Sequence, residues 1–387
     1  MNLFERFEVL EDPRDVRGKK YKLIDIIIMT IYGILNKQED FSNIAYFLEL
    51  NESYFVNLLK IECGKTPSHD CLSDIYAMIN PQKFMEIFIE WTKDIVKKKS
   101  GSIINIDGKA VREAQDKING GNIPYIVSAF LSEIGISIGQ VKVSDKSSEY
   151  TAIPELLDLM DIKGCTITID AAGTYTKIAE KILSKGGDFV LKAKENQPNL
   201  LADCKFSFDN RSENILCDET VEKNHGRIEK RKYYLYNDSK NMISDLKWDK
   251  IINSIGKIET TREYVGYDKT TVTEHYYVMN RNMTIEEFRK ATRSHWNIEC
   301  GLHWILDVIF NEDAMRNPRE RSSLLIPLGN REGDSIHNLS LVRKIVFNLV
   351  KLDTSFGKVP INRRLSNYQH DFSNIENLIF NVIPKHA

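Results

Sequence analysis

The sequence predicts an α/β protein in which a mixed β-sheet is flanked by helices. Three observations favour this class. Apolar residues recur at helical steps within the first hundred positions, short β-rich runs alternate with helical runs between residues 102 and 194, and a long helical repeat follows at 284–310. At 387 residues the chain is also too long for one ordinary core, so we expect several modules.

The first module, residues 1–99, is predicted to be helical. An apolar stripe with three- and four-residue spacing indicates a helix buried on one side, and it consists of Ile24, Ile27, Ile28, Ile31 and Leu35. Further helices are expected at 41–50 and 70–79. A lysine run that is followed by Ser100 and Gly101 marks the end of the module.

The second module, residues 100–194, is predicted to hold the sheet. The order of elements is three strands, a helix, a strand, a helix and a strand. The strands are expected at 103–106, 123–132, 135–144, 165–170 and 188–193, and the helices at 154–160 and 174–184. This order fits a mixed sheet whose first three strands are antiparallel and whose later strands are parallel.

Two further modules complete the chain. Residues 195–283 are rich in β-branched and aromatic side chains, so we expect an inserted β subdomain. Residues 284–387 begin with a long helix at 284–310 and contain a second apolar helix at 339–352. The buried face of the long helix is predicted from Phe288, Ala291, His295, Ile298, Leu302, Ile305 and Ile309.

Composition excludes several classes of protein. With 42% hydrophobic and 28% charged residues, the chain is neither a disordered nor a low-complexity polymer. No run approaches the ~20 apolar residues of a membrane span, and the acidic start does not match a signal peptide. The six cysteines are scattered without a Cys-x-x-Cys pair, which argues against a disulfide framework and a thiolate zinc knuckle. We therefore expect a cytoplasmic protein with reduced thiols and no membrane partner.

The net charge of 53 minus 55, or -2, does not by itself indicate nucleic-acid binding. Cations are nevertheless clustered at 13–22, 93–99, 225–236 and 316–344. These clusters predict local basic surfaces on a nearly neutral molecule.

Two predicted strands end in the same way. Asp107 follows the apolar run 103–106, and Asp170 follows the run 166–169. A carboxylate at the end of a buried strand is costly to desolvate unless it is paired or binds a cation. One such aspartate is explained simply as a turn or helix cap, but two in one sheet favour a shared site. Glu299 lies next to core residue Ile298 at the edge of the long helix's buried face, so it could face the sheet.

Three converging carboxylates suit Mg²⁺, which prefers oxygen ligands. In a two-metal site the ions lie ~3.5 to 4 Å apart and assist an in-line displacement at phosphorus. The pattern therefore indicates phosphodiester chemistry that needs no protein nucleophile.

These residues carry a resemblance to a known family. The chain resembles the DDE transposases of bacterial insertion sequences, and most closely their H-repeat-associated branch, from about residue 7 to about residue 352. The matching runs are 11–19 (EDPRDVRGK), 67–70 (PSHD), 106–109 (IDGK), 139–143 (GQVKV), 149–156 (EYTAIPEL), 169–171 (IDA), 186–192 (GGDFVLK), 225–229 (HGRIE), 295–299 (HWNIE) and 302–304 (LHW). Their number and order make the resemblance specific.

The resemblance implies an RNase H-like mixed sheet flanked by helices, an N-terminal helical DNA-binding domain and a β-rich insertion before the glutamate-bearing helix. It implies DNA strand cleavage and strand transfer at the ends of an insertion sequence. Asp107, Asp170 and Glu299 would be the catalytic residues and the ligands of two Mg²⁺ ions, with Mn²⁺ as a substitute. The implied partners are double-stranded DNA, as element ends and as target, and a second copy of the chain in a homodimer. Such a protein would work in the bacterial cytoplasm, on the nucleoid.

Seven further side chains are candidates for DNA contacts, namely Lys109, Arg112, Lys192, Lys194, Arg227, His295 and His303. Solvated side chains are the alternative for Lys109 and Arg112, and a solvated hairpin is the alternative for the run around Arg227. His295 and His303 flank Glu299 at four-residue steps and would permit zinc, although a core histidine is the simpler reading of His295. Trp296 and Trp304 are predicted to be packing residues, with stacking on an unpaired base as the alternative.

Two other functions remain open at this point. The chain could be a catalytically inactive DNA-binding derivative of a transposase, or an RNase H-like nuclease that only hydrolyses its substrate. The basic run from Arg14 to Lys22 makes the N-terminal helices the candidate for recognition of the DNA ends.

Overall fold

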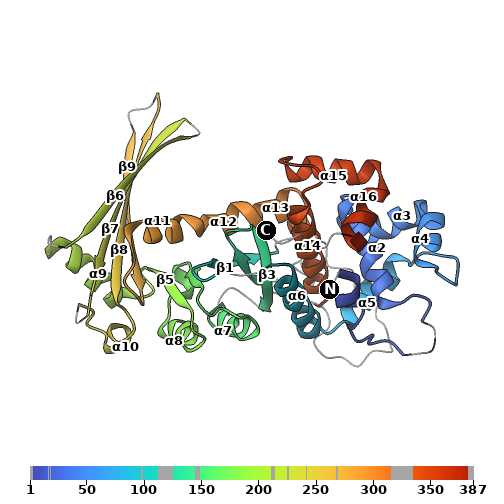
Figure 1. Ribbon diagram of the computed structural model, residues 1–387, viewed down its shortest axis with the longest axis horizontal. Helices are drawn as coiled ribbons and strands as arrows, with labels where there is room; N and C mark the ends of the chain where they lie inside the picture. Colours follow the sequence, from blue (N-terminus) through green and yellow to red (C-terminus); the bar gives the residue numbers. More distant parts are fainter. Residues whose placement is uncertain are drawn as a thin grey trace, which may run out of the picture.

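The computed structural model of the protein is elongated, with a large sheet toward one end and a group of helices at the other (Figure 1). It describes residues 3–15, 17, 19–96, 99–111, 125–143, 149–210, 214–224, 226–240, 242–266, 269–314 and 334–381. None of the helices in these ranges has the length and apolar character needed to cross a bilayer.

The N-terminal part is helical, as predicted. Its helices are α1 (Leu3–Phe7), α2 (Leu23–Leu35), α3 (Phe41–Leu50), α4 (Glu52–Leu59), α5 (His69–Met78) and α6 (Pro81–Ile95). The sequence predicted α2, α3 and α5 to within two residues but not α4 or α6. The prediction that α2 is buried on one side is wrong, because every residue of α2 is buried, including Asp25. Helices from the C-terminal part of the chain also pack against α2.

The first five strands form the predicted mixed sheet. They are β1 (Ile103–Ala110), β2 (Tyr125–Leu131), β3 (Ile136–Val143), β4 (Thr166–Ile169) and β5 (Asp188–Ala193), in the spatial order β3-β2-β1-β4-β5. Strand β2 is antiparallel to both of its neighbours, whereas β1, β4 and β5 run parallel. This is the expected RNase H-like arrangement, and it brings the carboxyl ends of β1 and β4 to the same edge.

The β-rich segment after β5 does not form a sheet of its own. Strands β6 (Leu216–Asn224), β7 (Arg227–Asn237), β8 (Ser254–Tyr264) and β9 (Thr270–Met279) continue the same sheet, because β9 pairs with β5. The predicted β-rich insertion at 195–283 therefore extends the central sheet through the pairing of β9 with β5. Unpaired β5 would expose a row of backbone hydrogen-bonding groups, and pairing with β9 satisfies them. The far ends of β6 to β9 project away from the rest of the molecule (Figure 1).

Helices lie on both faces of the sheet. On one face, α7 (Glu149–Leu159) packs against β2 and β3, and α8 (Thr176–Ser184) packs against β5. α7 begins earlier than predicted and contains Pro154. Two more helices, α9 (Pro198–Asn210) and α10 (Leu246–Asp249), lie within the β-rich segment. The other face is crossed by the helix that carries Glu299.

That long helix is a series of pieces rather than one regular α-helix. It comprises α11 (Ile285–Ser294), α12 (Trp296–Ile298), a π-helical turn (Glu299–His303) and α13 (Trp304–Val308). Its start is fixed by a capping box between Thr284 and Glu287. Apart from the π-helical turn, it occupies the predicted span.

The C-terminal helices return to the N-terminal part. They are α14 (Asp334–Leu352), α15 (Ile361–His370) and α16 (Phe372–Glu376). α14 packs against α2, α5, α6 and strand β3, so it joins the helical part to the sheet. It is buried from Ser335 to Val350, and that stretch includes Arg343 and Lys344.

Candidate active site

Polar side chains on one face of β1 and β4 fix the position of the glutamate-bearing helix. Asn105 of β1 donates a hydrogen bond to Thr168 of β4 at 2.6 Å. Thr168 Oγ1 lies 3.0 Å from His295 Nδ1, and Asn105 Nδ2 lies 3.5 Å from Ser294 Oγ. The opposite face of the sheet is apolar there. The side chains of Ile153 of α7 and Ile169 of β4 both pack against Gly173, which lies in the turn after β4. The end of α11 is thus held over the middle of the sheet.

The three predicted acids lie one step farther along each of these elements. Asp107 is two residues beyond Asn105, and Asp170 is two residues beyond Thr168, which advances each strand by about 6.6 Å on the same face. Glu299 is four residues beyond His295, a helical advance of about 6 Å. The register pairs Ile106 with Ile169, so the two aspartates follow on adjacent strands. Matched advances along strands and helix therefore bring the three carboxylates to one region.

The charges of these acids influence one another. Burial raises the pKa of the Glu299 carboxyl above its ordinary value, and the negative charges of Asp107 and Asp170 raise it further, while Lys192 opposes the shift. Asp107 and Asp170 are half-buried and Glu299 is exposed. Carboxylates that repel one another at close range destabilise the charged state unless a cation joins them. This electrostatic coupling indicates a site built to hold positive charge.

The π-helical turn begins at Glu299 itself. The amide of Trp304 donates to the carbonyl of Glu299, five residues earlier, where an α-helix would use a four-residue step. Such turns are rare and occur frequently at functional sites. Across it, His303 brings Nε2 to 3.4 Å from Asp107 Oδ2, although no hydrogen-bond partner is found for either of its ring nitrogens among the described residues.

The carboxylate oxygens of Asp107, Asp170 and Glu299 are suitable ligands for a hard divalent cation, although the three side chains are not arranged around one point. Among the described residues, no three histidine, cysteine, aspartate or glutamate side chains are arranged around a single point as one ion requires. Asp170 also caps the turn after β4, because its Oδ1 accepts a hydrogen bond from the amide of Ala172 at 2.7 Å. While Oδ1 caps this turn, Oδ2 of Asp170 remains available to bind a cation. Two aspartates and a glutamate on converging elements are the ligands that Mg²⁺ prefers.

Lys192, Lys194 and His295 lie differently with respect to the acids. Lys192 of β5 is half-buried, and its pKa lies below the ordinary value. Burial is the main cause and the positive charge of Lys194 adds to it, whereas the negative charges of Asp170 and Glu299 raise the pKa. Lys194 is exposed just beyond the end of β5. His295 is half-buried, and burial lowers its pKa despite the opposing charges of Asp107 and Asp170. Lys192 is therefore the candidate cation near Asp170 and Glu299.

Lys109, a candidate for DNA contact, is engaged within the protein. It forms ion pairs with Asp307, with Glu312 at 2.9 Å and with Asp313 at 3.5 Å. Burial alone would raise the pKa of the Glu312 carboxyl, but the charges of Lys109, Lys344 and Arg343 together hold it well below its ordinary value. This cluster connects the strand that carries Asp107 to the end of the helix that carries Glu299. The sequence contained no local signal for it, since Lys109 is about 200 positions from Asp307 and Glu312.

Arg227 is not brought to this site. Arg227, the first residue of β7, lies opposite Tyr264 of β8. Lys257, seven positions before Tyr264 on β8, is in register with Ala193 at the end of β5, because both pair with Tyr276 of β9. At about 3.3 Å per residue this separates Arg227 from the end of β5 by about 23 Å. Its side chain is paired with Glu229 at 2.8 Å. Arg112 lies outside the described residues.

Sequence reasoning assigned no role to a buried pair next to Asp107. The Tyr125 hydroxyl donates a hydrogen bond to Glu149, the first residue of α7. Burial and this hydrogen bond raise the pKa of Tyr125 above its ordinary value, and the charges of Asp107 and Asp170 contribute to the shift. The tyrosine therefore stays protonated. Because Tyr125 is directly opposite Ala110, the pair lies on the face of β1 opposite to Asp107.

Gly108 leaves the space that this pair occupies. A Cβ atom at position 108 would lie 2.3 Å from Tyr125 Cε1 and 2.5 Å from Glu149 Oε1. We expect Gly108→Ala to destabilise the protein by about 1–3 kcal/mol through overpacking and to displace Asp107. Urea unfolding measures the first effect, and DNA cleavage at matched folded concentration measures the second. An unchanged unfolding midpoint would contradict the close packing around Gly108.

Comparison with known proteins identifies the family. Residues 100–323, which include all three acids, match the family described as "Transposase DDE domain". This chain belongs to the DDE transposase family. Residues 4–92 of the transposase match a second family, described as "DDE_Tnp_1-associated".

Curated relatives place this transposase in the H-repeat-associated branch of the family. The chain is 32% identical over 369 residues to "H repeat-associated putative transposase YhhI" of Escherichia coli, covering 94% of this chain and 93% of the relative. It is 35% identical over 232 residues to "H repeat-associated putative transposase YbfD" of the same organism, covering 59% of this chain and 91% of the relative. The family and branch inferred from the sequence motifs are thereby confirmed.

A solved structure gives a more distant likeness. The "piggyBac transposase synaptic complex with hairpin DNA" is 12% identical, with a TM-score of 0.42, over 99% of this chain and 82% of that chain. A similarity of this size is too low to support an inference about the chain.

Proposed function

We propose that this transposase cuts DNA at the ends of its own element and joins the freed 3′ ends to target DNA in the same site. Asp107, Asp170 and Glu299 act as the catalytic carboxylates. The observation that carries the proposal is the contact between Asn105, Thr168 and His295, which holds the glutamate-bearing helix against β1 and β4. Each of the three acids lies about the same distance beyond its residue of this contact, along its own strand or helix. Membership of the DDE family supports the same residues, because all three lie in the matched range.

Each side chain has a defined task in this proposal. The three carboxylates hold two divalent cations, Mg²⁺ in the cell and Mn²⁺ as a substitute, which supply activation of the attacking oxygen and stabilisation of the departing one. Lys192 offers an ammonium group to the phosphate beside Asp170 and Glu299. His303, next to Asp107, can hydrogen-bond the attacking water or the 3′ hydroxyl with a ring nitrogen that has no protein partner among the described residues. The ion-pair cluster of Lys109 holds strand and helix in register.

The test is a reaction on DNA that carries both flanks of the gene. A supercoiled donor plasmid with these flanks is incubated with the full chain, a target plasmid and Mg²⁺. We expect nicks that leave 3′ hydroxyls at both flanks, followed by products in which those ends are joined to target. Cleavage without joining would instead support the hydrolytic nuclease, and binding without cleavage would support the inactive DNA-binding derivative.

Removal of the metal gives a separate prediction. Excess EDTA is expected to abolish both cleavage and joining, and added Mg²⁺ or Mn²⁺ is expected to restore them, because the carboxylates cannot activate water alone. Gel analysis of plasmid topology measures both steps. Cleavage that persists in EDTA at the same rate would refute the two-cation site.

Two structural features of the complex are part of the proposal. The basic run between Arg14 and Lys22 makes the N-terminal helices the candidate for end recognition, although Arg14 and Lys19 also pair with Asp12. Both ends must be brought together, so we propose a homodimer in the DNA complex. Light scattering of the chain with end-bearing DNA measures its stoichiometry.

A further inference from the structure

The outer side of the glutamate-bearing helix carries an exposed apolar stripe. Trp296, Cys300, Trp304 and Val308 recur at every fourth position. Trp296 is 57% exposed, Trp304 is 55% exposed and Val308 is 59% exposed, and Cys300 is exposed as a free thiol. The prediction that the tryptophans are packing residues is therefore wrong. Large apolar side chains that stay in contact with water in one row indicate a binding surface.

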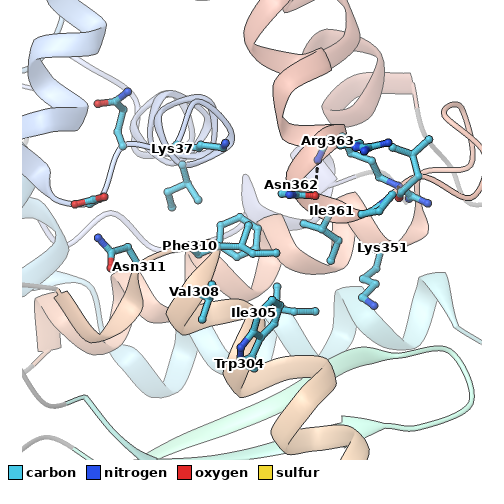
Figure 2. A pocket seen from close by; sticks show the side chains of 17 residues that line it. Lys37, Trp304, Ile305, Val308, Phe310, Asn311, Lys351, Ile361, Asn362 and Arg363 are labelled. Atoms are coloured by element: carbon cyan, nitrogen blue, oxygen red, sulfur yellow. Dashed lines mark hydrogen bonds between the residues drawn. The ribbon is translucent and has the colours of Figure 1, made fainter. Parts of the chain in front are cut away.

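The stripe leads into a groove of about 1020 Å³. Trp304 and Val308 of α13 form one wall, and the end of α2 and the start of α15 form the others (Figure 2). Trp304 directly follows the π-helical turn Glu299–His303, so the groove lies close to the active site along the helix.

The groove is positively charged. Lys37, Lys351 and Arg363 line it, and none of them forms a salt bridge to a carboxylate within the described parts of the chain. Figure 2 shows these three side chains around the groove. Arg364 is held in place by the carbonyls of Val350, Asp353, Val359 and Gly357. A single carboxylate, that of Glu39, stands among the described lining residues. This excess of cations contrasts with the net charge of -2 for the whole chain.

We infer that this groove binds a single strand of DNA, with a base stacked on Trp304 and the phosphates held by Lys37, Lys351 and Arg363. Sites for single strands combine a positive groove with exposed aromatic rings, which accept any base because every base has a flat face. A protein partner fits less well, because the cores of protein interfaces are depleted in lysine. The inference rests on the proposed function, in which cleavage at an element end frees a strand beside the helix that carries Glu299.

Binding is tested without catalysis, on the full chain in EDTA with a short oligothymidylate as the probe. Two of the four tryptophans, Trp91 and Trp248, are 2% and 1% exposed, so a base can quench only Trp296 and Trp304. We expect the oligonucleotide to quench tryptophan fluorescence, and we expect its affinity to fall steeply with salt. Anisotropy of a fluorescein-labelled copy gives the affinity for each variant.

The variants separate stacking from charge. Trp304→Leu is expected to weaken binding about tenfold, the loss of one stacked base, whereas Trp304→Phe retains most of the affinity. Lys351→Gln is expected to weaken binding and to reduce the salt dependence by about one counterion. Lys163→Gln is the matched control, because Lys163 is an exposed lysine in the turn before β4, at the end opposite Asp170, and it should bind as wild type. Thermal unfolding verifies that each variant is folded.

Several results would overturn the inference. They are an absence of quenching, wild-type affinity in Trp304→Leu, and equal affinity for a duplex of the same length. A fourth is dissociation of a dimer by Trp304→Leu with unchanged DNA binding, which would assign the stripe to contact between copies. Because the assay contains no metal, its failure leaves strand cleavage by the three acids untouched, and a failed cleavage test leaves this binding result intact.

Discussion

Asparagine in place of Asp107 is expected to slow DNA cleavage by at least about a thousandfold, and glutamine in place of Glu299 should do the same. Each tenfold loss corresponds to about 1.4 kcal/mol of barrier, and the loss of one charged ligand removes several such steps. The substitutions keep the size of the side chain and remove its charge. Single-turnover cleavage of end-bearing plasmid in Mg²⁺ measures the effect.

Stability separates lost chemistry from misfolding in these variants. Asp107 and Asp170 both raise the pKa of Glu299, so removal of one charge relieves repulsion in the absence of a cation. We therefore expect Asp107→Asn to melt at the same temperature as wild type or higher in EDTA. Asp209→Asn is the matched control, since Asp209 is an exposed aspartate on α9 and should cleave at the wild-type rate. Wild-type cleavage by Asp107→Asn would refute the assignment of the site.

The parts of the fold that the sequence predicted are those with a local pattern. The apolar run before Asp170 became β4, and the run 188–193 became β5 with the predicted bounds. The prediction that the first strand stops at Asp107 is wrong, because β1 continues to Ala110 through its pairing with β2. Both the strand and its polar end are encoded within a few consecutive residues, so each could be predicted without knowledge of the tertiary structure. The convergence of the three acids followed from those strand ends together with helical spacing around Glu299.

The features that the sequence did not indicate concern pairing and burial between distant segments. Nothing in the residues of β9 indicates that its partner is β5, because strand pairing depends on the whole fold. The full burial of α2 depends on helices from the other end of the chain, such as α14. The exposure of Trp296 and Trp304 did have a signal, since both lie off the predicted apolar face and four-residue steps connect them through Cys300.

Loss of the charge at Glu312 is expected to be among the most destabilising single changes in the chain. Its side chain is 1% exposed and accepts hydrogen bonds from Lys109 at 2.9 Å and from Ser340 at 2.7 Å. Glu312→Gln removes the counter-charge of the buried Lys344 and one of the three carboxylates that pair with Lys109. Breaking a buried ion pair in this way costs about 3–5 kcal/mol. Urea unfolding measures the change in the free energy of unfolding.

Lys109→Met makes the reciprocal change and also tests how the active site is held. It removes one of the three cations that compensate Glu312, so we expect a loss of stability. In the double variant Lys109→Met/Glu312→Leu we expect the two losses to be less than additive, because the ion pair between these residues is lost only once, although Lys344 still lacks its counter-charge. Lys142→Met is the matched control, since Lys142 pairs with Asp334 at 3.5 Å with side chains 31% and 22% exposed, and we expect a loss of at most about 1 kcal/mol.

The double variant Lys109→Met/Glu312→Leu should fold yet cleave DNA slowly, because the link between the strand of Asp107 and the helix of Glu299 is gone. Wild-type cleavage by that variant would show that the cluster stabilises the fold without positioning the carboxylates.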